Sequence, residues 1–296
     1  MKKKPAVVSR RTGWVPALLL VFFAGGVLTA WLMARHNTVP SVRKPTIPYP
    51  VERNADMNAA AVIPPPVSMP LAPVDQGKLL AIIIDDIGYR REPVERLLAA
   101  GIPLTFSVMP DQPYTKELAA QIAAAGQEVM LHLPMEPEND RTNNPGAGAL
   151  LLTEPDEDIR AAIGHDLGQV PQAKGVNNHM GSLFTQDERK MEVVLAELKT
   201  RNLFFVDSLT APNSVGYAVA RRLGLKSAAR RVFIDNDPGP DAISRHLRLA
   251  IDLAVKEGAV VAIGHPGAVT VAAIEKLKDD LVKAGVTPVF ASRVVR

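Results

Sequence analysis

The sequence predicts an α/β protein whose larger part, residues 78–296, is a distorted (β/α)7-type barrel of parallel strands. Two observations lead to this fold class. Short apolar segments alternate strictly with helical segments from residue 78 onwards, which indicates a parallel sheet with crossover helices. An uncharged run near the N-terminus, followed by a proline-rich segment, predicts one transmembrane helix and a linker ahead of the barrel.

The uncharged run covers 21 residues, 14–34, and predicts the transmembrane helix. At about 1.5 Å per residue such a helix is roughly 30 Å long, which matches the core of a bilayer. Trp14 and Trp31 lie near its two ends, where aromatic side chains favour the membrane interface. By the positive-inside rule, the basic residues 1–13 stay in the cytoplasm and the remainder lies outside. The cations before the run are Lys2, Lys3, Lys4, Arg10 and Arg11.

A cleaved signal peptide is the alternative interpretation of this run. The run is long for a signal peptide, and cleavage after Ala30 or Ala34 would put Leu28 or Leu32 at the −3 position, where small residues are usual. The sequence therefore favours an uncleaved anchor. Residues 35–77 contain nine prolines and no apolar periodicity, which predicts an extended, largely disordered linker.

The positive charge of the chain is concentrated at its N-terminus. Residues 1–44 carry eight basic side chains and no acidic one. The remainder holds 26 basic and 31 acidic side chains, a net charge of −5, which argues against a nucleic acid as partner. The chain contains no cysteine, which excludes disulfides, thiolate metal ligands and a cysteine nucleophile.

The first predicted strand, 79–84, is a continuous apolar run of the kind that is buried on both faces of a sheet. Seven further strands are predicted at 103–108, 128–133, 175–179, 203–207, 231–235, 259–263 and 287–291. Helical segments lie between them, and glycines such as Gly258 and Gly285 mark helix ends. The number and alternation of the elements favour a closed or nearly closed barrel. No Gly-x-Gly-x-x-Gly follows the first strand, so a dinucleotide-binding open sheet has no support.

Polar residues capable of chemistry gather at the C-terminal ends of these strands, the edge at which such barrels carry their active sites. They include Asp85, Asp86, His132, Asn178, His179, Asp207, Asp235 and His265. Asp and Asn also cap helices, so a capping or supporting role is the favoured interpretation of Asp207 and Asp235. Two adjacent acids after a buried strand favour function, because a buried carboxylate needs a partner. His165 and His246 lie on helical segments and are expected at the surface.

Histidines and carboxylates without cysteine suit a borderline divalent cation, Zn²⁺ first. Three protein ligands leave one position open for water, whose pKa the cation lowers towards about 7. A spare carboxylate can accept a proton from that water, and a spare histidine can protonate a leaving group. This residue set suits metal-assisted hydrolysis of an amide or ester. The sequence has neither a phosphate-binding Gly-rich Lys loop nor a Gly-x-Ser-x-Gly elbow.

From about residue 79 to residue 295 the sequence resembles the divergent polysaccharide deacetylases. They are a branch of a superfamily whose members remove N- or O-acetyl groups from chitin, peptidoglycan and xylan. The resemblance rests on four motifs taken together. These are Ile-Asp-Asp-Ile-Gly-Tyr at 84–89, Leu-His-Leu-Pro-Met-Glu at 131–136, Asn-Asn-His-Met-Gly-Ser at 177–182 and Gly-His-Pro at 264–266.

The resemblance implies that Asp85 is the general base and that Asp86 and His132 bind the metal. In the superfamily a second histidine follows the first by four residues, and Glu136 stands in that place here. We infer that His179 supplies the missing ligand. The third motif of the superfamily carries an arginine that orients the base, and this arginine is absent here.

One more role follows from the same resemblance. His265 is expected to be the general acid. Four more residues are expected to contact substrate or to support the residues that do: Glu136, Asn178, Asp207 and Asp235.

The expected protein is thus a single-pass protein of the bacterial inner membrane with a periplasmic hydrolase domain. Its expected activity is the metal-dependent deacetylation of a cell-envelope polysaccharide such as peptidoglycan. The alternative is a non-catalytic envelope factor that binds a glycan or a protein on a degenerate deacetylase fold, and the departures from the superfamily motifs favour it. The two differ in whether Asp85 and His265 are required.

Overall fold

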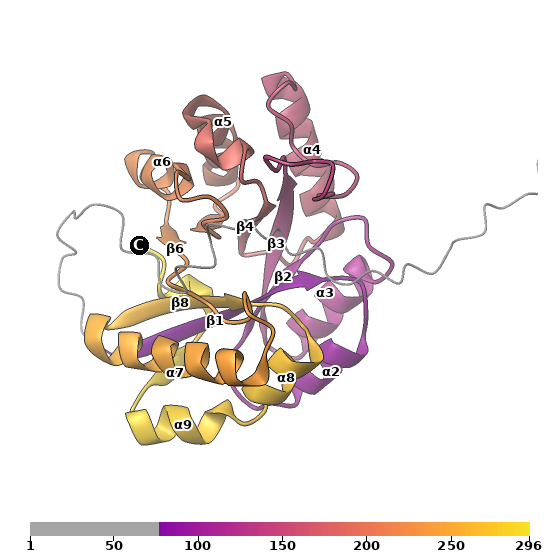
Figure 1. Cartoon of the computed structure of the whole chain (residues 1–296). Coiled ribbons are helices and arrows are strands. Elements are labelled where there is room, and N and C mark those ends of the chain that lie inside the picture. The colour runs from indigo at the N-terminus through magenta and orange to yellow at the C-terminus, as the bar shows by residue number, and fades with distance from the viewer. Residues whose placement is uncertain (1–76) are drawn as a thin grey trace, which may run out of the picture. The chain divides into compact units, whose positions relative to one another are not determined.

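The computed structural model describes residues 77–296 (Figure 1). The predicted cytoplasmic tail (1–13), the predicted transmembrane helix (14–34) and all but the last residue of the predicted linker (35–77) lie outside the described residues. Within residues 77–296, no helix combines the length and the apolar character needed to cross a membrane.

Nine strands form one sheet in which every pairing is parallel. The strands are β1 (Leu79–Ile87), β2 (Thr105–Val108), β3 (Glu128–Met135), β4 (Gly175–Met180), β5 (Phe204–Asp207), β6 (Ser227–Ala229), β7 (Val232–Phe233), β8 (Ala259–Gly264) and β9 (Thr287–Val289). Their order is β6-β5-β4-β3-β2-β1-β8-β7, with β9 also paired to β1. The predicted parallel α/β fold is confirmed.

Strand β1 lies in the middle of the sheet and pairs with three other strands. β8 pairs with it from Leu79 to Ile84, while β9 pairs with its first residues and β2 with its later ones. The two outermost strands, β6 and β7, are consecutive in the chain, and no pairing joins them within the described part of the chain. The sheet is therefore a half-barrel with an open seam between these two strands. The sequence did not predict β6, because three residues are too few to show a period.

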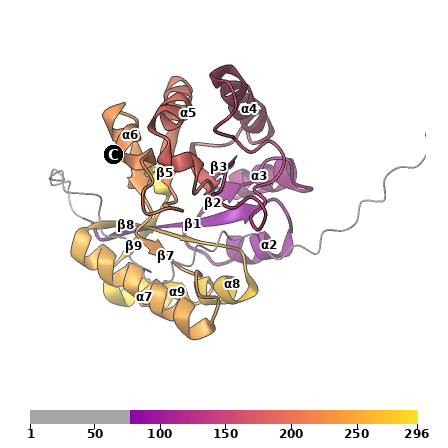
Figure 2. The ribbon, with the colours of Figure 1, turned by 45° about the horizontal axis from the view of Figure 1, so that its top comes forward.

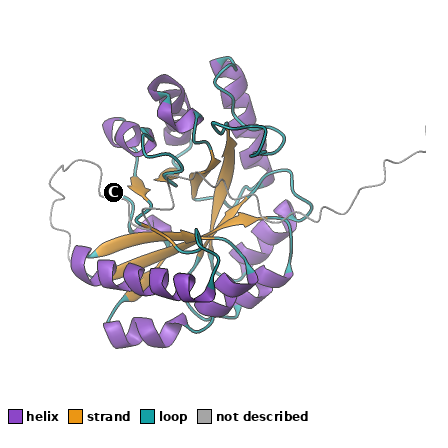
Figure 3. Ribbon diagram, viewed as in Figure 1, coloured by secondary structure: helices purple, strands orange, loops and turns teal. Residues whose placement is uncertain are grey.

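Helices cover the outside of the sheet (Figures 1, 2 and 3). They are α2 (Glu92–Leu98), α3 (Thr115–Ala124), α4 (Asp156–Gln169), α5 (Glu188–Thr200), α6 (Gly216–Arg222), α7 (Pro240–Glu257), α8 (Ala268–Ile274) and α9 (Leu277–Ala284). Their apolar faces pack with Leu80, Ile82 and Ile84 of β1 in one large buried cluster. Gly258 and Gly285 have positive φ angles of 88° and 63° at the ends of α7 and α9, which confirms these predicted helix stops.

The inside of the barrel is a second, smaller apolar cluster. Its strand residues alternate with those that face the helices, and they include Ala81, Ile83, Met130, Phe204, Val206, Val261 and Ile263. The chain returns beneath them after β9, so that Ala291 and Val294 join the cluster. Arg296 then exchanges backbone hydrogen bonds with Ser227 of β6. The last residues thus close the N-terminal end of the barrel, and the opposite end is left for polar side chains.

We predict that Gly175→Ala destabilises the fold and that Gly168→Ala does not. A Cβ at Gly175 would overlap the ring of Phe204 on the neighbouring strand, and such overpacking costs about 1–3 kcal/mol. A Cβ at Gly168, in the last turn of α4, meets nothing within 4 Å, so alanine should leave the stability unchanged or raise it by less than about 1 kcal/mol. Urea unfolding of both variants measures the difference. Equal stabilities would contradict the packing of β4 against β5.

Candidate metal centre

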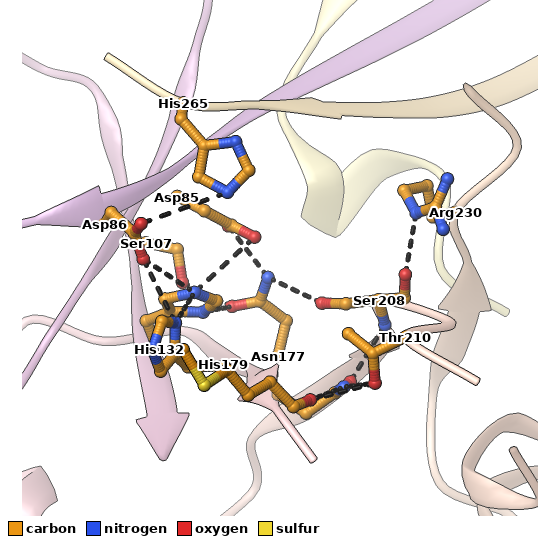
Figure 4. Close-up of polar contacts among 12 residues, drawn as sticks. Asp85, Asp86, Ser107, His132, Asn177, His179, Ser208, Thr210, Arg230 and His265 are labelled. Atoms are coloured by element: carbon orange, nitrogen blue, oxygen red, sulfur yellow. Dashed lines mark hydrogen bonds and ion pairs between the residues drawn. The ribbon is translucent and has the colours of Figure 1, made fainter. Parts of the chain in front are cut away.

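Along the strands, the side chains that point into the barrel change from apolar to polar towards the C-terminal end. Side chains two residues apart in a strand share a face, so each inward residue is followed by another inward residue two positions later. Such pairs are Ile83 and Asp85 on β1, Met130 and His132 on β3, Asn177 and His179 on β4, Val206 of β5 and the following Ser208, and Ile263 of β8 and the following His265. Figure 4 shows these polar side chains converging on one point.

The two adjacent acids of β1 both reach this point because the strand is irregular there. Adjacent residues of a regular strand point to opposite faces. The register of β1 against β2 shifts by one residue between Ile84 and Ile87, as at a β-bulge, and Asp86 has a left-handed φ of 56°. Both carboxylates consequently lie near the same ring nitrogen, His132 Nε2, at 3.6 Å from Asp85 Oδ2 and 3.4 Å from Asp86 Oδ1.

Three potential ligand atoms face one another without an intervening donor group: Asp86 Oδ1, His132 Nε2 and His179 Nδ1. Asp86 Oδ1 is 3.1 Å from His179 Nδ1 and 3.4 Å from His132 Nε2, and the two ring nitrogens are 3.1 Å apart. All three side chains are almost fully buried. Neither carboxylate oxygen of Asp86 has a hydrogen-bond partner. The imidazoles of His132 and His179 are therefore the groups that offset the charge of this buried carboxylate.

The residues present fit a divalent cation at this place. Ligands at about 2.0–2.1 Å from a tetrahedral Zn²⁺ lie about 3.3 Å from one another, close to the three separations of this cluster. The donor set of two imidazoles and one carboxylate is the type that catalytic zinc sites use. A cation would also provide the partner that the buried Asp86 carboxylate lacks.

Asn177 determines which nitrogen of His132 can bind a cation. Its amide Nδ2 donates to Asp85 Oδ1 at 2.9 Å and to Ser208 Oγ at 3.1 Å, which directs its Oδ1 towards His132 Nδ1 at 3.0 Å. Since an amide oxygen only accepts, Nδ1 of His132 must carry the proton. In the neutral imidazole, Nε2 then carries the lone pair and faces Asp86. Ser107 Oγ also donates to this amide oxygen.

The electrostatics of the cluster agree with metal-binding protonation states for Asp86 and His179. Burial alone would raise the pKa of Asp86, but the neighbouring His179 and His132 outweigh it and hold this pKa well below its usual range. Burial lowers the pKa of His179, so its imidazole tends to be neutral. An ionised carboxylate and a neutral imidazole are the forms that bind metals.

His265 and Asp235 form a pair on the other side of the two acids. Asp235 Oδ1 lies 3.0 Å from His265 Nδ1, and its Oδ2 accepts from the backbone N–H of His265 at 2.7 Å and from Thr270. Burial disfavours the imidazolium, but the carboxylate of Asp235 outweighs this and raises the pKa of His265 to about 9. His265 Nε2 points towards Asp86 Oδ2, 4.0 Å away.

Arg230 brings a buried positive charge close to the site from the segment between β6 and β7. It donates from Nε to the carbonyl of Ser208 at 2.6 Å and from Nη2 to that of Leu209 at 2.9 Å. Burial lowers the pKa of Arg230 to about 10, against the attraction of Asp207 and Asp85. Burial likewise raises the pKa of Asp85. Arg230 was not predicted from the sequence, because no motif surrounds it and only the fold brings the segment between β6 and β7 beside Ser208.

The other predicted residues lie around this centre in supporting positions. Glu136 accepts from the backbone N–H of Leu152 at 2.7 Å and so holds the loop after β3. Asp207 directs all its hydrogen bonds to the loop that follows it, at Leu209, Ser214 and Tyr217.

Asn178 points away from the barrel interior, unlike Asn177. Its amide contacts Met180, Thr210 and Ser208, which joins the ends of β4 and β5. Of the two adjacent asparagines, the sequence prediction singled out Asn178, while the structure places Asn177 among the acids and histidines. The signal that could have distinguished them is parity, since Asn177 and His179 are two residues apart and share a face.

We predict that Asn177→Asp lowers the Zn²⁺ affinity of the protein about 10- to 100-fold, the usual effect of removing a group that orients a ligand. The amide donor to Asp85 would be lost and two buried carboxylates would face each other, which displaces the side chain that holds His132 Nδ1. Isothermal titration with Zn²⁺ measures the change. Asn178→Asp is the matched control, because it alters the same chemistry on the opposite face. Equal affinities of the two variants would contradict the assignment.

Comparison with known proteins places the chain in a family. The sequence profile of the divergent polysaccharide deacetylases matches residues 82–295. The uncharacterized protein YibQ of Escherichia coli is 36% identical over 208 residues, 70% of this chain and 64% of that protein, so the match spans just under two thirds of the relative. A protein of Haemophilus influenzae is 31% identical over 66% of this chain and 69% of its own length.

The fold also matches a solved structure. The crystal structure of an uncharacterized protein from Agrobacterium tumefaciens superposes with a TM-score of 0.70 at 21% identity, covering 83% of this chain and 98% of the other. The profile match extends over most of the chain and includes all four motifs. The chain belongs to the divergent polysaccharide deacetylase family.

Proposed function

We propose that this protein is a metal-dependent deacetylase that hydrolyses N- or O-acetyl groups of a cell-envelope polysaccharide, with peptidoglycan as the substrate to test first. One observation carries the proposal. Three buried ligand atoms converge at one point, and Asp85 and His265 lie next to them. Membership of the family supports the carbohydrate substrate.

Asp86, His132 and His179 would hold the cation. When bound there, a divalent cation supplies Lewis-acid chemistry, polarising the acyl carbonyl and lowering the pKa of a water. Asp85 accepts the proton of the attacking water at its Oδ2, since its Oδ1 is engaged by Asn177. Burial raises the pKa of Asp85, which makes it a stronger base than an exposed aspartate.

His265 completes the reaction as the general acid. Asp235 holds its Nδ1, so that Nε2 faces the site and donates a proton to the leaving amine or alcohol as the bond to the acetyl carbon breaks. The raised pKa, about 9, keeps this proton in place at neutral pH. The products are acetate and the free amine or hydroxyl of the sugar.

We predict distinct effects for ligand and base substitutions. Asp86→Ala and His132→Ala should remove both the bound metal and acetate release from peptidoglycan or chitooligosaccharides. Asp85→Asn should keep the metal and lower kcat by about 10²- to 10⁴-fold, the usual contribution of a general base. The full chain is assayed for metal content by mass spectrometry and for acetate by an enzyme-coupled reaction. Unchanged activity in Asp86→Ala would refute the proposal.

A cellular test separates this enzyme from a non-catalytic binding factor. Asp85→Asn and His265→Ala remove the predicted base and acid without filling the site. If both variants complement a deletion strain fully, the fold binds a glycan or a protein and does not catalyse. If both fail while remaining at wild-type abundance, catalysis is required.

We further propose that residues 14–34 anchor the protein in the inner membrane and that the hydrolase domain works in the periplasm at the end of the linker 35–77. The uncharged run and the cations before it support this. We predict that the protein isolated from the membrane fraction retains residues 1–34 by intact-mass measurement. A mature chain that begins after Ala30 or Ala34 would instead establish a cleaved signal peptide.

A further inference from the structure

A second cluster of potential ligands lies outside the metal centre described above. Asp111, in the loop after β2, and two consecutive residues of α4, His165 and Asp166, each offer one ligand atom within 4.8 Å of the others. His165 Nε2 is 3.6 Å from Asp111 Oδ1. The cluster shares no residue with the group around Asp86.

Asp166 is the unusual member of this cluster because it is the buried one. The residue is only 2% exposed, and its Oδ2 has no hydrogen-bond partner. Burial, reinforced by the charge of Asp111, raises the pKa of Asp166 to about 7. A carboxylate in this position is costly unless a positive charge joins it.

Gln169 orients the other two members. Its Oε1 accepts from the backbone N–H of Asp111 at 3.0 Å, so its Nε2 points at Asp111 Oδ1 at 2.7 Å and at His165 Nε2 at 2.9 Å. An amide nitrogen only donates, so His165 Nε2 accepts from Gln169 and carries a lone pair, which a cation would take over by displacing this hydrogen bond. Gln169 Nε2 thus donates to two of the three ligand atoms, at the place where a cation would bind them. Asp166 Oδ2 receives no hydrogen bond from it or from any other donor in the described residues.

We propose that Asp111, His165 and Asp166 form a second divalent-cation site that ties the loop after β2 to α4. One imidazole and two carboxylates suit a borderline cation such as Zn²⁺. Two ligands at about 2.0–2.2 Å from one ion lie roughly 3–4 Å apart, in agreement with the separation of His165 from Asp111. Asp111 and His165 are exposed, so water can complete the coordination.

The site would act on the metal centre through the loop that carries Asp111. Met109 and Tyr114 in this loop donate backbone hydrogen bonds to the carbonyls of Ile87 and Gly88, directly after the two acids of β1. A cation at the second site therefore restrains the segment that follows Asp86. Its role is structural: it holds the loop and takes no part in the reaction.

The test titrates the metal-free full chain with Zn²⁺ alone. We expect two ions per wild-type chain, one in Asp166→Asn, one in Asp86→Asn and none in the double variant. Thermal unfolding in the Asp86→Asn background should show a rise in Tm on adding Zn²⁺, and this rise should disappear when Asp166→Asn is added. Asp158→Asn, an exposed change of the same charge on α4, is the control and should keep both ions.

His165→Ala provides an independent variant, because this side chain is 66% exposed and its loss should leave the fold intact. In the Asp86→Asn background it should weaken Zn²⁺ binding by more than about tenfold. If His165→Ala and Asp166→Asn both bind Zn²⁺ as their parent does, the site does not exist. If Asp86→Asn has no effect but Asp166→Asn removes an ion, the second site stands and the proposed metal centre falls.

Discussion

The alternation of side chains along parallel strands is the constraint on which the rest of this structure depends. Alternate side chains of each strand pack against the helices, and the side chains between them point into the barrel. The C-terminal segment, with Ala291 and Val294, closes the barrel at the N-terminal ends of the strands. Polar side chains at the opposite ends are thereby enclosed among apolar ones, where acids and histidines must find partners in one another.

Two buried acids, Asp85 and Asp86, are given different environments although they are adjacent. Asp86 lies against the imidazoles of His132 and His179, which hold its pKa well below the usual range and keep it ionised despite its burial. Asp85 is held by the amide of Asn177, and burial raises its pKa. The irregularity in β1 makes this division possible, because it turns both carboxylates inward and still leaves each with different neighbours. Separated pKa values of this kind suit an acid–base reaction.

Most of the fold was predictable from the sequence, because apolar runs such as that of β1 and glycines at helix ends are local signals. Eight of the nine strands lie where the sequence predicted them. β6 was not predicted, since three residues show no period, and neither was the open seam beside it. Where the sheet remains open depends on contacts between segments that are distant in the sequence. The regions before residue 77 lie outside the described structure, and their assignment stays a prediction.

The sequence by itself determined which chemical groups stand at the ends of the strands: Asp85, Asp86, His132, His179 and His265 could all be read from local pattern. Only the tertiary structure decided how they are arranged. It showed that an extra residue in β1 brings both acids to one side, that Asn177 rather than Asn178 orients His132, and that Arg230 lies close by. The physical reason is that strand periodicity is a local property, whereas hydrogen-bond partners and burial come from segments that only folding brings together.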